Sequence, residues 1–218
     1  MPDDRLARQL RGFGPLGLVA ILLILAGNFL FIPLSALLVL AWAQASQTPW
    51  RDLGFVRPRS WTRSLAIGIA FGALFKLTMK AVVMPLLGAP PINARYHFLA
   101  GNAAALPAML YAVIIGAGFG EETLFRGYLF ERLGRLLGHG RAAKIVIVLT
   151  TATLFAAAHY PDQGIPGVEQ AAVTGLVFGG IFVVTGELFM LMVAHAAFDL
   201  VALALIYWNL EGKLPLWP

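Results

Sequence analysis

The chain has 218 residues, of which 59% are hydrophobic and 12% are charged. Soluble domains carry about 25% charged residues, so this composition excludes an ordinary soluble protein and indicates one embedded in a membrane. The net charge of +5 is scattered between apolar segments instead of covering one face, which argues against nucleic-acid binding. The absence of cysteine excludes disulfides, zinc–thiolate sites and cysteine nucleophiles.

The first apolar stretch covers residues 14–43 and is too long for a cleaved signal peptide. Asn28 and Pro33 interrupt it, and because proline breaks a helix we expect two short helices with a turn between them. Both flanks are rich in arginine, which favours a cytoplasmic N-terminus. We therefore expect residues 1–64 to form an N-terminal helical hairpin followed by a cytoplasmic loop.

The remaining segments complete an all-α, polytopic transmembrane bundle of about seven helices, within a range of six to eight, since each span needs roughly 20 residues. We expect one integral membrane domain over residues 1–218, with residues 65–210 as its catalytic core. Gly138 to Gly140 and Gly186 to Glu187 are predicted turns, and the polar residues 159–169 are a predicted external or re-entrant loop. The predicted apolar segments are residues 65–87, 99–120 (running on without a polar break), 145–158, 170–185 and 188–208.

Charged residues at membrane depth are rare and costly, at about 2.5–3.5 kcal/mol each on insertion scales. Glu122 and Arg126 are four residues apart and can pair on one helical face, whereas Glu121 points elsewhere and lacks that partner. An unpaired carboxylate in a low-dielectric site is suited to proton transfer. The alternative is an interfacial helix start, where acidic residues are favoured by the helix dipole.

Two histidines lie in or beside other apolar segments. His159 follows Phe155 and three alanines, and the alternative to catalysis is a histidine that caps a helix at the membrane surface. His195 and Asp199 share one helical face, where they can bind a metal, donate hydrogen bonds or form a polar clasp between helices. An antiparallel hairpin that turns at Gly138 brings Glu121 and His159 to a similar depth, roughly 25–29 Å from the turn. His195 lies at the same depth in the membrane if that hairpin protrudes some 10 Å into the cytoplasm.

These residues resemble the CPBP (Abi) family of intramembrane proteases, which includes the CAAX prenyl endopeptidases. The family pattern EExxxR, FxxxH and HxxxN or HxxxD is matched at residues 121–126, 155–159 and 195–199, in that order. Residues 50–55 are similar to a loop that commonly precedes the family's core. The resemblance implies an all-helical fold and peptide-bond hydrolysis within the membrane.

The resemblance also implies roles for individual residues. Glu121 with His159 activates water, His195 and Asp199 line the oxyanion side, and Glu122 with Arg126 supports the site. We expect no cofactor, because two histidine ligands at short spacing on one helix, as in HExxH, do not occur here. A zinc ion held by Glu121, His159 and His195 is the alternative. An ionised Asp199 cannot donate a hydrogen bond, so it is either protonated or orients His195.

The expected partners are membrane lipids and a membrane-associated protein or peptide substrate, and the expected location is the cell membrane (the bacterial inner membrane), crossed several times. Two other functions remain open. One is a non-enzymatic immunity or scaffold protein, and the other is a proton-coupled transporter that uses the buried Glu and His residues with Lys76 and Lys80. Gly116 with Gly120 and Gly175 with Gly179 are spaced for close helix contacts, within one chain before any dimer.

Overall fold

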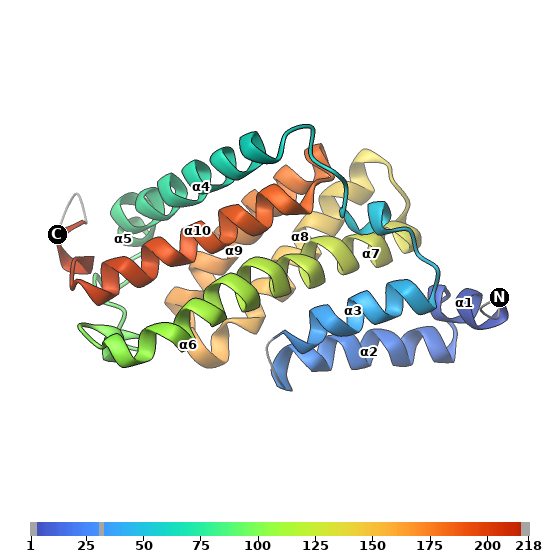
Figure 1. The fold of residues 1–218 in the computed structure, drawn as a ribbon, viewed down its shortest axis with the longest axis horizontal. Helices are drawn as coiled ribbons and strands as arrows, with labels where there is room; N and C mark the ends of the chain where they lie inside the picture. The colour runs from blue at the N-terminus through green and yellow to red at the C-terminus, as the bar shows by residue number, and fades with distance from the viewer. Residues whose placement is uncertain (1–3, 31–32, 215–218) are drawn as a thin grey trace.

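The computed structural model describes residues 4–30 and 33–214, and these ranges contain helices but no β-strand (Figure 1). This confirms the predicted all-α fold class. The longer elements are α1 (Asp4–Arg11), α2 (Pro15–Leu30), α3 (Leu34–Ala45), α4 (Trp61–Thr78), η5 (Ala112–Tyr128), α7 (Leu129–Leu137), α8 (Arg141–Ala158), α9 (Tyr160–Thr185) and α10 (Leu188–Tyr207). The shorter ones are η1 (Trp50–Leu53), η2 (Met79–Val83), α5 (Met84–Leu86), η3 (His97–Leu99), η4 (Ala103–Ala105), α6 (Leu106–Tyr111) and η6 (Glu211–Lys213).

Five helices among the described residues are long and apolar enough to cross a membrane. They are Trp61–Leu86, Ala103–Leu137, Arg141–Ala158, Tyr160–Thr185 and Leu188–Tyr207. The pair α1 and α2, bent by 58°, gives a sixth if it is counted as one span, and α3 is a shorter apolar helix. The predicted count of about seven is compatible with this set, and the chain is a multi-pass membrane protein.

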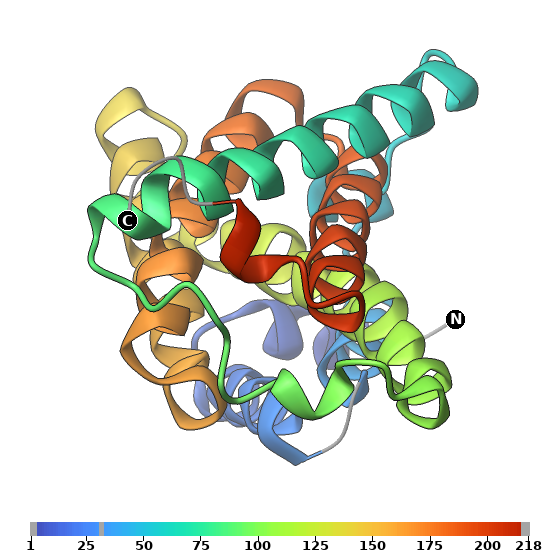
Figure 2. The same cartoon turned by 90° about the vertical axis from the view of Figure 1, so that its left-hand side faces the viewer.

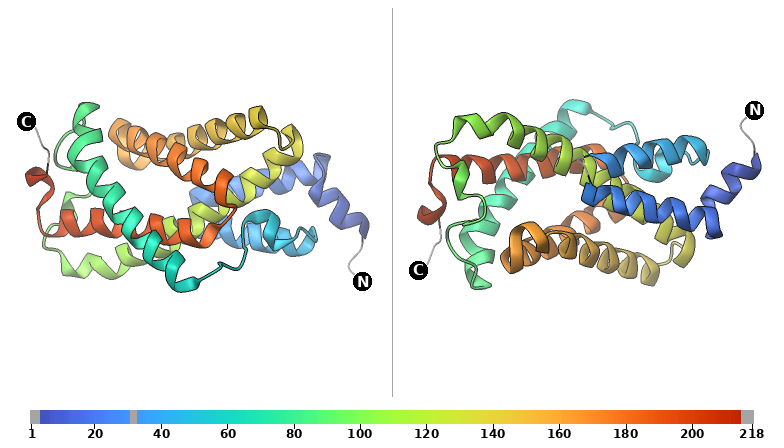
Figure 3. Two further views of the ribbon diagram at one scale, coloured as in Figure 1. Left: turned by 90° about the horizontal axis from the view of Figure 1, so that it is seen from above. Right: turned by 90° about the horizontal axis from the view of Figure 1, so that it is seen from below.

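Two helices, α2 and α3, occupy the first apolar stretch and pack against each other as an N-terminal hairpin. Residues 31–32 of the predicted turn between Asn28 and Pro33 lie outside the described residues, as do residues 215–218 of the tail. The Trp42 Nε1–H donates to the Leu10 carbonyl oxygen at 3.1 Å and so joins α3 to α1. Figure 3 shows the hairpin beside α7, at the end of the molecule away from α5 and η6.

A continuous helix of 35 residues, Ala103–Leu137, crosses the middle of the molecule and includes α6, η5 and α7. Its central part, η5, has the wide turns of a π-helix, which in other proteins are frequent at functional sites. The helix η5 packs against α3, α8, α9 and α10. Viewed from the end that carries η6, α4 lies at the top of the bundle and the α2–α3 hairpin at the bottom (Figure 2). Residues on η5 can therefore meet residues from most of the other long helices.

The predicted turns at Gly138 and Gly186 are confirmed. Both glycines have positive φ, of 85° and 62°, a conformation that other residues rarely adopt. The prediction of a loop over residues 159–169 was wrong, because α9 begins at Tyr160, directly after α8. The chain instead kinks at Gly164, with φ 64° and ψ −160°, and Pro166 lies just beyond, near the start of a new helical stretch where proline is tolerated.

Glycines permit the closest helix contacts. A methyl group at Gly72 of α4 would lie only 2.0 Å from the Ala194 carbonyl oxygen of α10. A methyl group at Gly175 of α9 would lie 3.0 Å from Ala152 of α8. The contact at Gly175 confirms the predicted packing within the chain, whereas the contact at Gly72 was not predicted. Through Gly72, the backbone of α10 is fixed next to His195.

Candidate active site

The innermost part of the site is an ion pair within η5. The Arg126 Nη1–H donates to Glu122 Oε1 at 2.9 Å, and the two side chains are 2% and 0% exposed. The guanidinium group also lies 4.5 Å from the centre of the Phe155 ring on α8. This confirms the ion pair predicted from the spacing of Glu122 and Arg126. A charged pair this deeply buried is stable only while both partners remain.

Glu122 has a second partner on α10. Its Oε1 lies 2.7 Å from Nδ1 of His195, and since an ionised carboxylate only accepts, Nδ1–H is the donor. The edge-on ring of Phe178, 5.4 Å from that of His195, also restrains the imidazole. The sequence did not reveal this hydrogen bond because the two residues are 73 positions apart. Glu122 therefore orients His195, a role that the sequence left open for Asp199.

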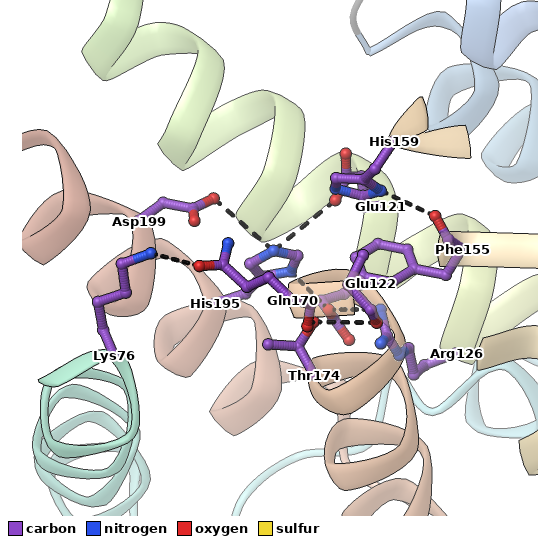
Figure 4. A network of polar contacts seen from close by, with 11 residues as sticks. Lys76, Glu121, Glu122, Arg126, Phe155, His159, Gln170, Thr174, His195 and Asp199 are labelled. Atoms are coloured by element: carbon purple, nitrogen blue, oxygen red, sulfur yellow. Dashed lines mark hydrogen bonds and ion pairs between the residues drawn. The ribbon is translucent and has the colours of Figure 1, made fainter. Parts of the chain in front are cut away.

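The other nitrogen of His195 faces two carboxylates. Its Nε2 lies 3.7 Å from Glu121 Oε2 and 3.7 Å from Asp199 Oδ2, beyond hydrogen-bonding distance (Figure 4). The side chains of Glu121 and Asp199 are 26% and 24% exposed, so both are open to a cavity. Within the described part of the chain, Glu121 Oε2 has no hydrogen-bond partner. Glu121, His195 and Asp199 thus meet at the cavity, and their facing atoms are free to form hydrogen bonds with a ligand.

His159 approaches from the junction of α8 and α9. Its Nδ1–H donates to the Phe155 carbonyl oxygen at 2.8 Å, because a carbonyl can only accept. In the neutral ring this leaves Nε2 with a lone pair. The Phe155 ring packs against the His159 ring, with 4.5 Å between their centres. In the FxxxH motif, Phe155 therefore both positions the His159 ring and fixes its tautomer.

A cavity of about 790 Å³ joins these groups. Glu121, His159, His195 and Asp199 all line it, whereas Glu122 and Arg126 lie behind its wall. The structure thus brings together the four residues expected to act in catalysis and places the two supporting residues next to them. The cavity is also lined by Lys76, whose role the sequence left open, and by Gln170, which the sequence did not assign to the site. Gln170 carries no charge and begins no recognisable motif, so nothing in the sequence marks it.

The zinc alternative needs at least three ligands on one ion. Among residues 4–30 and 33–214, no three His, Asp or Glu side chains are grouped so that they could hold a metal ion. The Nδ1 atom of His195 is bound to Glu122, so Nε2, which lies 3.7 Å from Glu121 Oε2 and 3.7 Å from Asp199 Oδ2, is the nitrogen that a metal could reach.

A comparison with protein-family models gave a match that includes the site residues. Residues 103–201 match the family model described as Rce1-like, type II CAAX prenyl endopeptidase. This confirms the resemblance. The Rce1-like segment runs from η4 into α10 and contains all three motifs of the site. Searches of curated proteins and of solved structures found no match. An endopeptidase family supports a protease, and the matched segment supplies Glu121, His159, His195 and Asp199 to the cavity just described.

Proposed function

We propose that the protein is an intramembrane endopeptidase of the CAAX-protease type, which hydrolyses a peptide bond of a membrane-associated protein or peptide. Glu121 is its general base, assisted by His159, and His195 and Asp199 act on the oxyanion side. The observation that carries the proposal is the state of Glu121. Its side chain lines the cavity, and its buried Oε2 lacks a hydrogen-bond partner among the described residues and lies 3.7 Å from His195 Nε2.

In the proposed reaction Glu121 takes a proton from water while His159 Nε2 orients that water. The water oxygen then bonds to the carbonyl carbon of the scissile peptide, and the carbonyl oxygen gains negative charge. His195, protonated on both nitrogens, donates from Nε2 to this oxyanion, and a protonated Asp199 donates beside it. Glu121 passes its proton to the peptide nitrogen, the C–N bond breaks, and the products are a carboxylic acid and an amine.

The adjacent residues Glu121 and Glu122 are proposed to have different roles. Glu122 is buried, bound to Arg126 and to His195, and is proposed to hold the histidine and the helix in place. Glu121 has no such bonds and is proposed to exchange protons. The proposed steps use no metal ion. We also propose that the N-terminus is cytoplasmic and that the protein lies in the cell membrane.

The test is cleavage by the purified full chain in liposomes, with a membrane-anchored reporter peptide and with the products identified by mass spectrometry. We expect Glu121→Gln to reduce kcat by about a thousandfold, comparable to the loss of a general base and its hydrogen bonds. Its elution volume and thermal unfolding should match the wild type, because Gln keeps the size of the side chain.

Three outcomes would contradict the proposal. Full turnover by the Glu121→Gln variant would exclude Glu121 as the base. Absence of cleavage by the wild type over a panel of anchored peptides, together with proton uptake that Glu121→Gln abolishes, would indicate a transporter instead. Loss of expression in every Glu121 variant, again without wild-type cleavage, would favour a scaffold or immunity protein.

A further inference from the structure

Two lysines one helical turn apart differ in their partners. Lys76 lies in the last turn of α4, and Lys80 lies in η2. The Lys80 Nζ donates to Glu211 Oε1 at 3.1 Å and to the Pro91 carbonyl oxygen at 2.5 Å, so its charge is neutralised by a carboxylate. The Lys80–Glu211 ion pair joins η2 to η6, so Lys80 has a structural role.

Lys76 has a different environment. The residue is 7% exposed, and its Nζ donates to the neutral Gln170 Oε1 at 2.7 Å and lies 4.7 Å from the centre of the Phe198 ring. In the part of the chain that the structure describes, no Asp or Glu oxygen lies within 4.0 Å of it. The nearest carboxylate on α10, Asp199, is directed to His195 instead (Figure 4).

A buried ammonium group without a paired anion is costly, and sequences keep such groups mainly where they act. Lys76 lines the same cavity of about 790 Å³ as Glu121, His159 and His195, so a bound ligand can touch all of them. An ammonium group and a polarised amide are suited to an anion with two acceptor oxygens. Lys76 can donate to both oxygens of a carboxylate, and the Gln170 NH₂ group can support one of them.

We propose that Lys76, supported by Gln170, is the residue that binds the free C-terminal carboxylate of the substrate. This rests on the proposed function, because the cavity must first bind a peptide. An extended peptide covers roughly 3.3–3.6 Å per residue, so a carboxylate held at one wall sets which peptide bond reaches Glu121. Lys76 thus acts as the specificity residue of the site, with Gln170 as its positioning partner.

The experiment compares two anchored peptides that are identical except for a C-terminal carboxylate or a C-terminal amide. For the wild type we expect kcat/KM to favour the carboxylate by about tenfold to a hundredfold, the range of one charge-assisted hydrogen bond. Lys76→Met should lower this ratio to near one by slowing only the carboxylate peptide. Lys76→Arg should keep most of the preference. Lys144→Met, at the exposed start of α8, serves as the control for loss of a charge and should leave the ratio unchanged.

Equal cleavage of both peptides by the wild type would overturn the carboxylate subsite while leaving the proposed protease intact. Failure to cleave either one would instead count against the proposed function. The anion that Lys76 binds could also be a lipid phosphate. Repeating the assay in neutral and in anionic liposomes distinguishes the peptide carboxylate from the lipid phosphate. If anionic lipid slows the wild type but not Lys76→Met, and the two peptides are cleaved alike, Lys76 binds lipid headgroups and the proposal is wrong.

Discussion

Two regions of one long helix contain the same local motif, a glutamate with an arginine four residues later. Glu122 pairs with Arg126 in η5, and Glu131 pairs with Arg135 in α7. Both glutamate side chains are buried, at 0% and 4% exposed. The arginines differ, since the Arg126 side chain is 2% exposed and the Arg135 side chain is 37% exposed. The spacing alone therefore does not separate a functional pair from a structural one.

The two pairs differ in the further residue that each glutamate contacts. Glu122 also binds His195, which opens to the cavity. Glu131 lies 3.6 Å from Arg132, and that arginine donates to the carbonyl oxygens of Arg11 and Gly12 at 2.8 and 3.0 Å. The first cluster orients a histidine at the cavity wall, while the second fastens α7 to the N-terminal segment. Substitutions in the two clusters should consequently affect different properties.

The largest effect is expected for Glu122→Ala. This change leaves Arg126 buried without its carboxylate, which costs about 3–5 kcal/mol of stability, and it also frees His195. We expect both a large fall in the temperature of unfolding in detergent and loss of cleavage. Glu131→Ala should cost less, because Arg135 can turn towards solvent and the buried Arg132 keeps its hydrogen bonds to the carbonyl oxygens of Arg11 and Gly12. Equal destabilisation by the two changes would show that the further residue that each glutamate contacts has no influence.

A more selective effect is expected for His195→Asn. Asn can still donate to Glu122, so the fold should hold, but the donor proposed for the oxyanion is lost. We expect kcat to fall by about a hundredfold to a thousandfold, as for other oxyanion donors, with KM nearly unchanged. The measurement is steady-state cleavage of the anchored reporter peptide. An unchanged kcat would remove His195 from the reaction.

Arg132→Met tests the structural cluster. The change removes two hydrogen bonds to the carbonyl oxygens of Arg11 and Gly12, and charged hydrogen bonds contribute about 1.5–3 kcal/mol each to stability. We expect a lower unfolding temperature, while the kcat of the molecules that remain folded stays within about twofold because Arg132 does not line the cavity. A fall in kcat beyond that would connect this cluster to the reaction.

The smallest effect is expected for Asp199→Asn. An amide donates a hydrogen bond without needing a proton from solution, so it can replace a protonated Asp199 on the oxyanion side. We expect kcat/KM to stay within about fivefold, whereas Asp199→Ala should reduce it by tenfold or more. If Asn proves as harmful as Ala, Asp199 acts as a carboxylate and its assignment to the oxyanion side is wrong.

The sequence predicted those features that local chemistry determines. Gly138 and Gly186 marked helix ends, and the spacing of Glu122 and Arg126 predicted their ion pair. The helix at residues 160–163 was missed because its proline lies in the first turn, where proline does not break a helix. The Glu122–His195 bond and the pairing of Lys76 with Gln170 were missed because they join residues 73 and 94 positions apart. Such contacts depend on helix packing, which periodicity does not specify.

The central claim is that Glu121 and His159 share one water-accessible cavity that binds the substrate, whereas Glu122 lies behind its wall. The absence of cysteine allows a direct measurement with single-cysteine variants in liposomes and a water-soluble methanethiosulfonate reagent. The positions are 121, 159 and, for the wall behind the cavity, the buried Thr123 next to Glu122, where cysteine keeps the Glu122–Arg126 pair. We expect fast modification at positions 121 and 159, slow modification at 123, and protection of the first two by a substrate peptide. Equally slow modification at 121 and 123, or no protection by the peptide, would contradict the proposed active site.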